Sequence, residues 1–143
     1  MATTRTAHTI WNGDLPSGSG QVTLDSSGLG TYDVTWKARA EQAGGKTSPE
    51  ELIAAAHSAC FSMAFSHALG EENKGAPEQV HTTADVTFQP GEGITGIHLT
   101  LKAKVPGLSQ DDFQRIADAA KTGCPVSAAL TGTTITLDAT LES

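Results

Sequence analysis

The two cysteines of the chain, Cys60 and Cys124, are the residues most able to carry chemistry. Cys60 lies within "SPEELIAAAHSACFSM" (residues 48–63), an apolar stretch that also places a histidine and two serines close to it. A free cysteine is often a small apolar core residue, so packing alone explains Cys60 equally well. Cys124 directly precedes Pro125 at a predicted helix start, where backbone N–H groups and the helix dipole favour a thiolate. Sixty-four residues separate the two, so spacing does not predict whether they meet.

Other chemistry around Cys60 is disfavoured by the spacing. His57 and Cys60 form an H-x-x-C pair, which offers a metal only two ligands, and no further His/Cys cluster accompanies it. The nearby serines have no aspartate partner at a suggestive position, which argues against serine-hydrolase chemistry. Two cysteines without a C-x-x-C spacing are too few for a secreted disulfide framework. In a reducing compartment such a pair is either inert or redox-active.

Composition limits the possible partners. The chain has 143 residues, with 9 basic and 16 acidic side chains and a formal charge of −7. Nucleic acids and anionic membranes need a basic face, so we expect neither as a partner. The start, "MATTRTAHTI", lacks the pattern of a signal peptide. The apolar run over 52–69 is interrupted by histidines and serines, which disfavours a membrane span. We therefore expect a cytoplasmic protein.

The N-terminal part, residues 1–40, alternates apolar and polar residues. "QVTLD" (21–25) and "TYDVTWKAR" (31–39) predict half-buried strands. With the segment around Ile10 and Trp11 they predict a three-stranded antiparallel unit.

A long helix is predicted over residues 48–70. Ser48 is a suitable N-cap, Pro49 suits the first helical position, and Glu51 completes a capping box, while Gly70 would end the helix. Its middle is apolar or small on nearly every face, which is typical of a helix buried all round. A single chain of this size is too small to bury such a helix on all sides. The pattern therefore favours an intertwined homodimer.

The C-terminal part, residues 79–143, predicts a hairpin, two helices and a final strand. The hairpin pairs 80–88 with 97–105, Ser109 caps an amphipathic helix that stops at Gly123, a short helix follows Cys124, and a strand covers 133–141. We therefore expect one domain, 1–143, of the α+β class, with antiparallel sheets wrapped around a long central helix.

Two segments carry a resemblance to a known family. "TSPEELIAAAHSACFSMAFSHALGE" and, later, "KTGCPVSAAL" followed by "ITLDATL" resemble the signature regions of the OsmC branch of the OsmC/Ohr family. These are bacterial hydroperoxide reductases induced by osmotic or oxidative stress. The similarity covers nearly the whole chain, including "IWNGDLPSGSGQVT" and "HTTADVTF".

The resemblance implies a mechanism without metal, haem or other cofactor. Cys60 would be the peroxidatic cysteine that reduces an organic hydroperoxide, and Cys124 would resolve its sulfenic acid as a disulfide. Arg39 would activate the Cys60 thiolate, and Glu50 would orient the arginine. An external dithiol, such as a dihydrolipoyl protein, would reduce the disulfide. The family forms intertwined dimers with sites at the interface.

Residue chemistry supports some of these roles and leaves others open. A mid-helix cysteine has no helix N-terminus to lower its pKa, so a cation must do so. Arg39 lies on the polar face of a predicted strand, and without the resemblance it is a solvated surface residue. Glu50 would also suit the helix dipole. Ten residues separate Glu50 from Cys60, about 15 Å of rise, so Glu50 would act from the partner subunit or through Arg39.

Substrate preference is indicated by the apolar neighbours of Cys60. Phe61, Met63 and Phe65 suggest an apolar surround, which suits alkyl hydroperoxides better than hydrogen peroxide. The alternative function is a non-catalytic, ligand-binding stress protein on the same fold, with both cysteines packed and unreactive.

Overall fold

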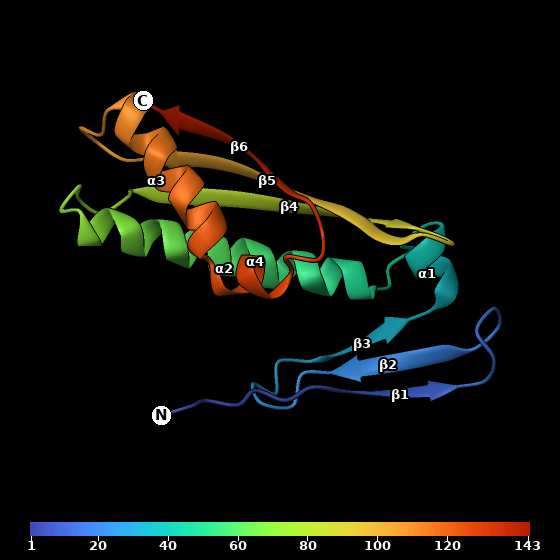
Figure 1. The fold of residues 1–143 in the computed structure, drawn as a ribbon. Helices are drawn as coiled ribbons and strands as arrows, with labels where there is room; N and C mark the ends of the chain where they lie inside the picture. Colours follow the sequence, from blue (N-terminus) through green and yellow to red (C-terminus); the bar gives the residue numbers. More distant parts are fainter. The chain divides into compact units, whose positions relative to one another are not determined.

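The computed structural model describes residues 1–143 and confirms the α+β class (Figure 1). The chain divides into two compact units, Met1–Leu52 and Ile53–Ser143. The elements, in chain order, are β1 (His8–Asn12), β2 (Ser19–Thr23), β3 (Thr31–Val34), α1 (Trp36–Ala40), α2 (Pro49–Glu71), β4 (Gln79–Gln89), β5 (Gly93–Lys104), α3 (Gln110–Gly123), α4 (Pro125–Ala129) and β6 (Ile135–Glu142).

The first unit is a three-stranded antiparallel sheet in the order β1-β2-β3, as the alternation predicted. It has little core of its own. Val22 is its one buried apolar side chain, whereas Ile10, Leu29 and Tyr32 are all exposed. The stability of a small unit depends on the apolar area that it buries. This sheet buries too little apolar area to be stable alone.

The third predicted strand is wrong beyond Val34. Thr35 has extended backbone angles and its Oγ1 accepts a hydrogen bond from the Ala38 N–H (3.1 Å), which starts helix α1. Alanine, lysine and arginine are good helix formers, so a local N-cap outweighed the apolar alternation. Arg39 therefore lies on α1 and not on the polar face of a strand.

Helix α2 starts as predicted and ends one residue later. The Ser48 Oγ accepts the Glu51 N–H (3.1 Å), which confirms the N-cap, while the Glu51 carboxylate accepts from the Thr47 hydroxyl (2.6 Å). Gly70 remains helical and the chain turns at Asn73, whose φ is 55°. Asparagine tolerates this left-handed conformation better than most residues, so it supplies the stop expected of a glycine.

The second unit holds a mixed sheet in the order β4-β5-β6. Strands β4 and β5 form the predicted antiparallel hairpin, but β6 pairs with β5 in parallel, from Ile97↔Ile135 to Lys104↔Glu142. The expectation of purely antiparallel sheets is therefore wrong for this pair. A parallel pair needs a crossover connection, and α3 and α4 provide it.

The core of the second unit lies between this sheet, α2 and α3 (Figure 1). Alternate β5 residues and the predicted i, i+3, i+4, i+7 face of α3 are buried. The rings of Phe65 on α2 and Phe113 on α3 meet edge to face, with centroids 5.7 Å apart. The fully buried large side chains include Phe61, Phe65, Leu69, Leu99, Leu101, Phe113 and Ile116.

Helix α2 is not buried all round within one chain. Its buried stripe runs from His57 through Phe61 and Phe65, while Ala59 and Met63 on another side are exposed, Met63 at 72%. By length and composition alone α2 is also able to cross a membrane, a test that the core helix of a soluble protein passes as well.

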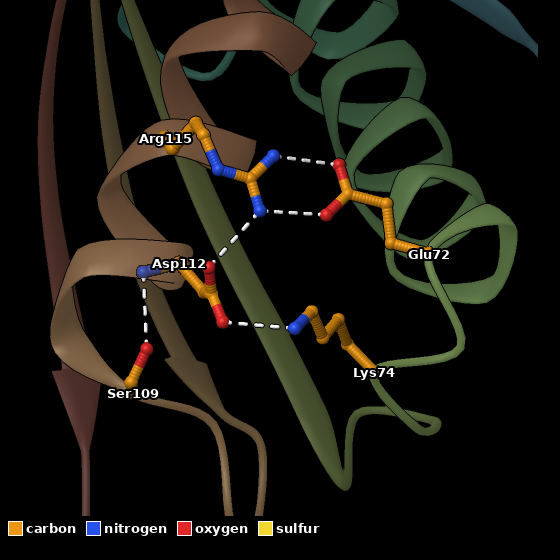
Figure 2. A network of polar contacts seen from close by, with 5 residues as sticks. All are labelled: Glu72, Lys74, Ser109, Asp112 and Arg115. Atoms are coloured by element: carbon orange, nitrogen blue, oxygen red, sulfur yellow. Dashed lines mark hydrogen bonds and ion pairs between the residues drawn. The ribbon is translucent and has the colours of Figure 1, made fainter.

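An exposed ionic network joins the C-terminal end of α2 to the first turns of α3 (Figure 2). Arg115 donates to both carboxylate oxygens of Glu72 (2.7 and 2.6 Å) and to Asp112 (3.0 Å), and Lys74 lies 2.9 Å from Asp112. The Asp112 N–H donates to Ser109, the predicted N-cap (3.2 Å). Lys74 and Arg115 lower the pKa of Asp112 to about 2.

Candidate active site

The two cysteines meet within the second unit. The Sγ atoms of Cys60 and Cys124 lie 2.9 Å apart and share a hydrogen bond, although the residues are 64 positions apart in the chain. Both are free thiols. A disulfide of about 2.05 Å can form between them with a small local movement. This juxtaposition is the central feature of the site.

Cys60 is positioned by the middle of α2. It is half-buried at the flank of the stripe that carries His57 and Phe61. The neighbouring serines have other partners, because Ser58 Oγ donates to the Ala55 carbonyl (3.1 Å) and Ser62 Oγ to the Ser58 carbonyl (2.8 Å). Back-bonding of this kind is typical of serines inside helices. These two hydroxyls therefore have structural hydrogen bonds within or beside α2.

Cys124 is positioned by the junction of α3 and α4. Its N–H donates to the Ala120 carbonyl (3.0 Å) at the end of α3, and Pro125 then opens α4, as the sequence predicted. The side chain is fully buried. The turn thus fixes this sulfur against α2 with no freedom for it to face solvent.

The environments of the two sulfurs differ. Burial raises the pKa of Cys60, and the contact with Cys124 raises it further, against the opposing effect of the Val126 N–H. Burial also raises the pKa of Cys124, but the polar contacts with Cys60, Ser127 and Val126 outweigh it, so the net pKa lies below its usual value. Within this unit no basic side chain contributes to the shift at Cys60.

A second buried polar contact lies beside the sulfurs. His57 Nε2 and Ser127 Oγ are 2.7 Å apart, with His57 fully buried and Ser127 3% exposed. Burial lowers the pKa of His57, and its Nδ1 has no hydrogen-bond partner. The sequence marked His57 only as a weak base or ligand candidate. It gave no signal for Ser127, whose partner is seventy positions away.

Arg39 and Glu50 form an ion pair in the first unit. Arg39 Nε donates to both Glu50 oxygens, at 2.7 and 3.2 Å. The Glu50 side chain is 7% exposed and that of Arg39 31%. The interpretation of Arg39 as a solvated strand residue is therefore wrong, because its guanidinium is held by a buried carboxylate.

The same arginine borders an apolar cavity of about 370 Å³ in the first unit. Indole rings, aliphatic side chains and a proline form most of its wall. The lining residues are Thr9, Trp11, Leu15, Val22, Val34, Thr35, Trp36, Arg39, Pro49 and Leu52. A cavity that combines apolar walls with one cation suits a ligand that has an alkyl part and a polar or anionic end.

The apolar residues next to Cys60 in sequence differ in burial. Phe61 and Phe65 are fully buried in the core, and Met63 is largely exposed. Successive helical residues point 100° apart, so sequence neighbours of Cys60 face other directions. The apolar surround suggested by Phe61, Met63 and Phe65 therefore stays a prediction.

The chain is similar to several known proteins. The family model described as "OsmC-like protein" matches residues 42–138. The chain is 44% identical over 136 residues to "Peroxiredoxin OsmC" of Escherichia coli K12, with 93% of each chain covered. A solved organic hydroperoxide resistance protein OsmC from Legionella pneumophila is 28% identical, with a TM-score of 0.66 over 94% of this chain and 96% of that one. OhrB of Bacillus subtilis is 26% identical, with a TM-score of 0.67 over 94% and 98%.

The fold and the paired thiols thus define a two-cysteine α+β protein. The chain belongs to the family of OsmC-like proteins, and the resemblance found in the sequence is confirmed.

Proposed function

We propose that the protein is a thiol-dependent peroxidase that reduces organic hydroperoxides to alcohols. The observation that carries the proposal is the 2.9 Å separation of the Cys60 and Cys124 sulfurs. The relatives' names support it, since they include a peroxiredoxin and organic hydroperoxide resistance proteins.

The reaction proceeds in two balanced steps on the protein. The Cys60 thiolate attacks the distal peroxide oxygen, the O–O bond breaks, and the leaving alkoxide takes a proton to give the alcohol and a Cys60 sulfenic acid. The Cys124 sulfur then attacks the sulfenic sulfur, the S–O bond breaks, and the released hydroxide takes the proton of Cys124 to give water and a disulfide. An external dithiol, for which a dihydrolipoyl protein is our candidate, restores both thiols.

The proposal includes Arg39 as the cation that activates Cys60, with Glu50 orienting it. Burial and Cys124 raise the pKa of Cys60, and the second unit supplies no cation to offset them. A thiolate at neutral pH therefore needs a positive charge from elsewhere. The Arg39–Glu50 ion pair supplies a fixed guanidinium, and the cavity beside Arg39 suits the alkyl part of the substrate.

An intertwined homodimer, each subunit a single domain over residues 1–143, is also part of the proposal. Two observations support it. The first unit buries only one apolar side chain, and α2 has an exposed side around Ala59 and Met63. Contiguous exposed apolar surface is typical of association sites. A solution monomer with full activity, in size-exclusion chromatography coupled to an activity assay, would overturn this part. We further propose that the enzyme acts in the cytoplasm, where reducing conditions keep both thiols available.

The test is a single-turnover titration of the reduced protein with one equivalent of an organic hydroperoxide. We expect the loss of both thiols and a mass decrease of about 2 Da, the signature of an intramolecular disulfide. Cys60→Ser should abolish the reaction, and Cys124→Ser should stop it with an oxidised Cys60. Persistence of two unchanged thiols in the wild-type protein would instead favour the ligand-binding function.

A further inference from the structure

The cavity beside Arg39 has the side chain of Trp11 in its wall, and this side chain lies against strand β2 at Gly20. Trp11 stands directly opposite Gly20 in the pairing of β1 with β2, and Val34 stands opposite Gly20 on β3. Residues paired in this way point to the same face of a sheet. Because Trp11 and Val34 both line the cavity, a side chain at position 20 would also point to the cavity side of the sheet.

Gly20 leaves no room for such a side chain. A Cβ atom at this position would lie 2.8 Å from Trp11 Cε3, 2.9 Å from the Ile10 carbonyl oxygen and 3.2 Å from Val34 Cγ2. These distances are shorter than the separations at which heavy atoms attract one another. Gly20 does not have a positive φ, so its backbone conformation suits any residue. The close approach of its neighbours, above all the Trp11 ring, is what requires a glycine here.

The Trp11 ring is also held from its other end. Its Nε1 donates a hydrogen bond to the Gly13 carbonyl (2.9 Å), at the start of the loop that carries Leu15, a further residue of the cavity wall. The ring therefore lies between this loop and the backbone of β2. A side chain at position 20 would push the ring away from the sheet, on the side where the cavity lies.

We propose that Gly20 is a specificity-determining residue, because it lets the Trp11 ring lie close against β2 and so sets the length of the alkyl group that the cavity accepts. The proposal rests on the function proposed above, in which this cavity of about 370 Å³ holds the alkyl part of the hydroperoxide. Each methylene group that an apolar cavity buries raises the affinity about fourfold, until the chain is longer than the cavity. Gly20 acts through Trp11 and has no part in the reaction of the sulfurs.

A purely structural role predicts a different result. An aromatic ring placed across a strand glycine also stabilises a sheet by covering it. If that were the only role of the pair, a substitution at Gly20 would lower the melting temperature and leave the preferred ligand length unchanged. The length of the bound ligand is therefore the measurement that separates the two roles.

The experiment titrates the full-length reduced protein with straight-chain primary alcohols from butanol to decanol. These alcohols carry an alkyl chain but no peroxide. The two tryptophans of the chain, Trp11 and Trp36, both line the cavity, so tryptophan fluorescence reports on its occupation. In the wild-type protein we expect the affinity to rise about fourfold per methylene up to a cut-off length and to level off beyond it.

Gly20→Ala should move this cut-off to an alcohol about two methylenes shorter. The longest alcohols should then bind about tenfold more weakly, whereas the shortest should bind almost as in the wild type. Trp11→Phe removes the ring that carries Cε3, so the double variant Gly20→Ala/Trp11→Phe should recover the wild-type cut-off, with Trp36 as the remaining reporter. Gly96→Ala is the matched control, since a Cβ on this β5 glycine comes no closer than 3.8 Å to the Thr134 carbonyl oxygen. It should keep the wild-type cut-off.

An unchanged cut-off in Gly20→Ala would overturn the proposal, as would an equal loss of affinity for all alcohols or a double variant without recovery. A wild-type protein that binds none of the alcohols would overturn it too. If Gly20→Ala fails to fold, Trp11→Ala decides the matter, because it enlarges the cavity and must move the cut-off to longer alcohols.

The outcome is independent of the single-turnover titration, because no peroxide enters the experiment. Two thiols lost to hydroperoxide together with an unmoved cut-off would overturn the role of Gly20 alone. A moved cut-off in a protein whose thiols persist would keep Gly20 as the determinant of ligand length and overturn the peroxidase alone.

Discussion

Helix α2 meets the helices that follow β5 through one set of contacts at its end and another at its middle, and the two sets differ in exposure and in charge. At its end, Glu72 and Lys74 meet Asp112 and Arg115 in an exposed network of full charges (Figure 2). At its middle, the half-buried Cys60 meets the fully buried Cys124 through a contact between the two sulfurs.

The difference indicates at which of the two places a substitution should have the smaller effect. In the exposed network water replaces a lost partner, so each ion pair contributes little to the free energy of folding. Cys124, His57 and Ser127 are buried, so water replaces a lost partner there less readily and each hydrogen bond made or lost has a larger effect on stability. We therefore expect activity to follow the buried contacts and to be indifferent to the network. Four predictions test this contrast.

The largest difference should be between Cys60→Ser and Arg115→Gln. We expect the first to reduce the single-turnover rate of hydroperoxide reduction at least about a thousandfold, because it removes the nucleophile. The second should leave that rate unchanged, although it breaks the most extensive ion pair of the network. Stopped-flow mixing of reduced protein with hydroperoxide measures both. A comparable loss in both variants would contradict the contrast.

The half-buried Arg39–Glu50 pair lies between these extremes. Arg39→Met keeps the stem but removes the charge, and we expect a rate about 10- to 100-fold lower at neutral pH, since a nearby opposite charge shifts a pKa by about 1 to 3. The rate should recover as the pH rises and Cys60 ionises unaided. Rapid kinetics across pH, with Arg39→Lys as the charge-conserving control, measure the effect. An identical pH profile in Arg39→Met would exclude Arg39 as the activating cation.

Removal of a buried hydroxyl should also destabilise the protein more than removal of an exposed one. Ser127→Ala leaves the buried His57 Nε2 without a partner, and we expect the free energy of unfolding to fall by about 1–3 kcal/mol. Ser58→Ala removes a hydroxyl that bonds only within α2, to the Ala55 carbonyl, and should cost less. Urea denaturation of the reduced proteins provides the comparison. Equal losses would mean that burial of the His57–Ser127 contact contributes nothing.

The smallest effect should be that of Arg115→Gln on stability, and it should depend on salt and pH. The pKa of Asp112 is lowered from 3.8 to about 2, chiefly by Lys74 and Arg115, so its stabilising effect is complete above about pH 4. That effect is lost as the pH falls towards 2. The gap in melting temperature between wild type and Arg115→Gln should narrow over this range and with added salt. A gap independent of both would point to packing of the arginine stem.

Much of the fold could be predicted because its signals are local. Ser48 and Ser109 cap their helices where the pattern placed them, and β4 and β5 alternate as expected. Two errors also had local causes that the sequence contained. Thr35 is a suitable N-cap, and a connection with two helices between β5 and β6 favours a parallel crossover.

The geometry of the candidate site could not be predicted in this way. The contacts between Cys60 and Cys124, and between His57 and Ser127, join α2 to α4 across the intervening hairpin and α3, and no spacing rule covers such separations. The family resemblance implied a role for both cysteines but not the second pair. Which hydroxyl meets the buried histidine depends on how α4 packs against α2, and therefore on the tertiary structure alone.

The parallel pairing of β6 also has a consequence for the order of folding. Cys124 lies in the crossover between β5 and β6, and this crossover is anchored at its far end only when β6 joins the sheet. During synthesis Cys60 emerges first, then Cys124, and β6 after both, and such non-local pairing is slow. We therefore expect the thiols to be held together only late, once β6 has been made. We expect a disulfide between the two sulfurs to form in the nascent chain only after that point.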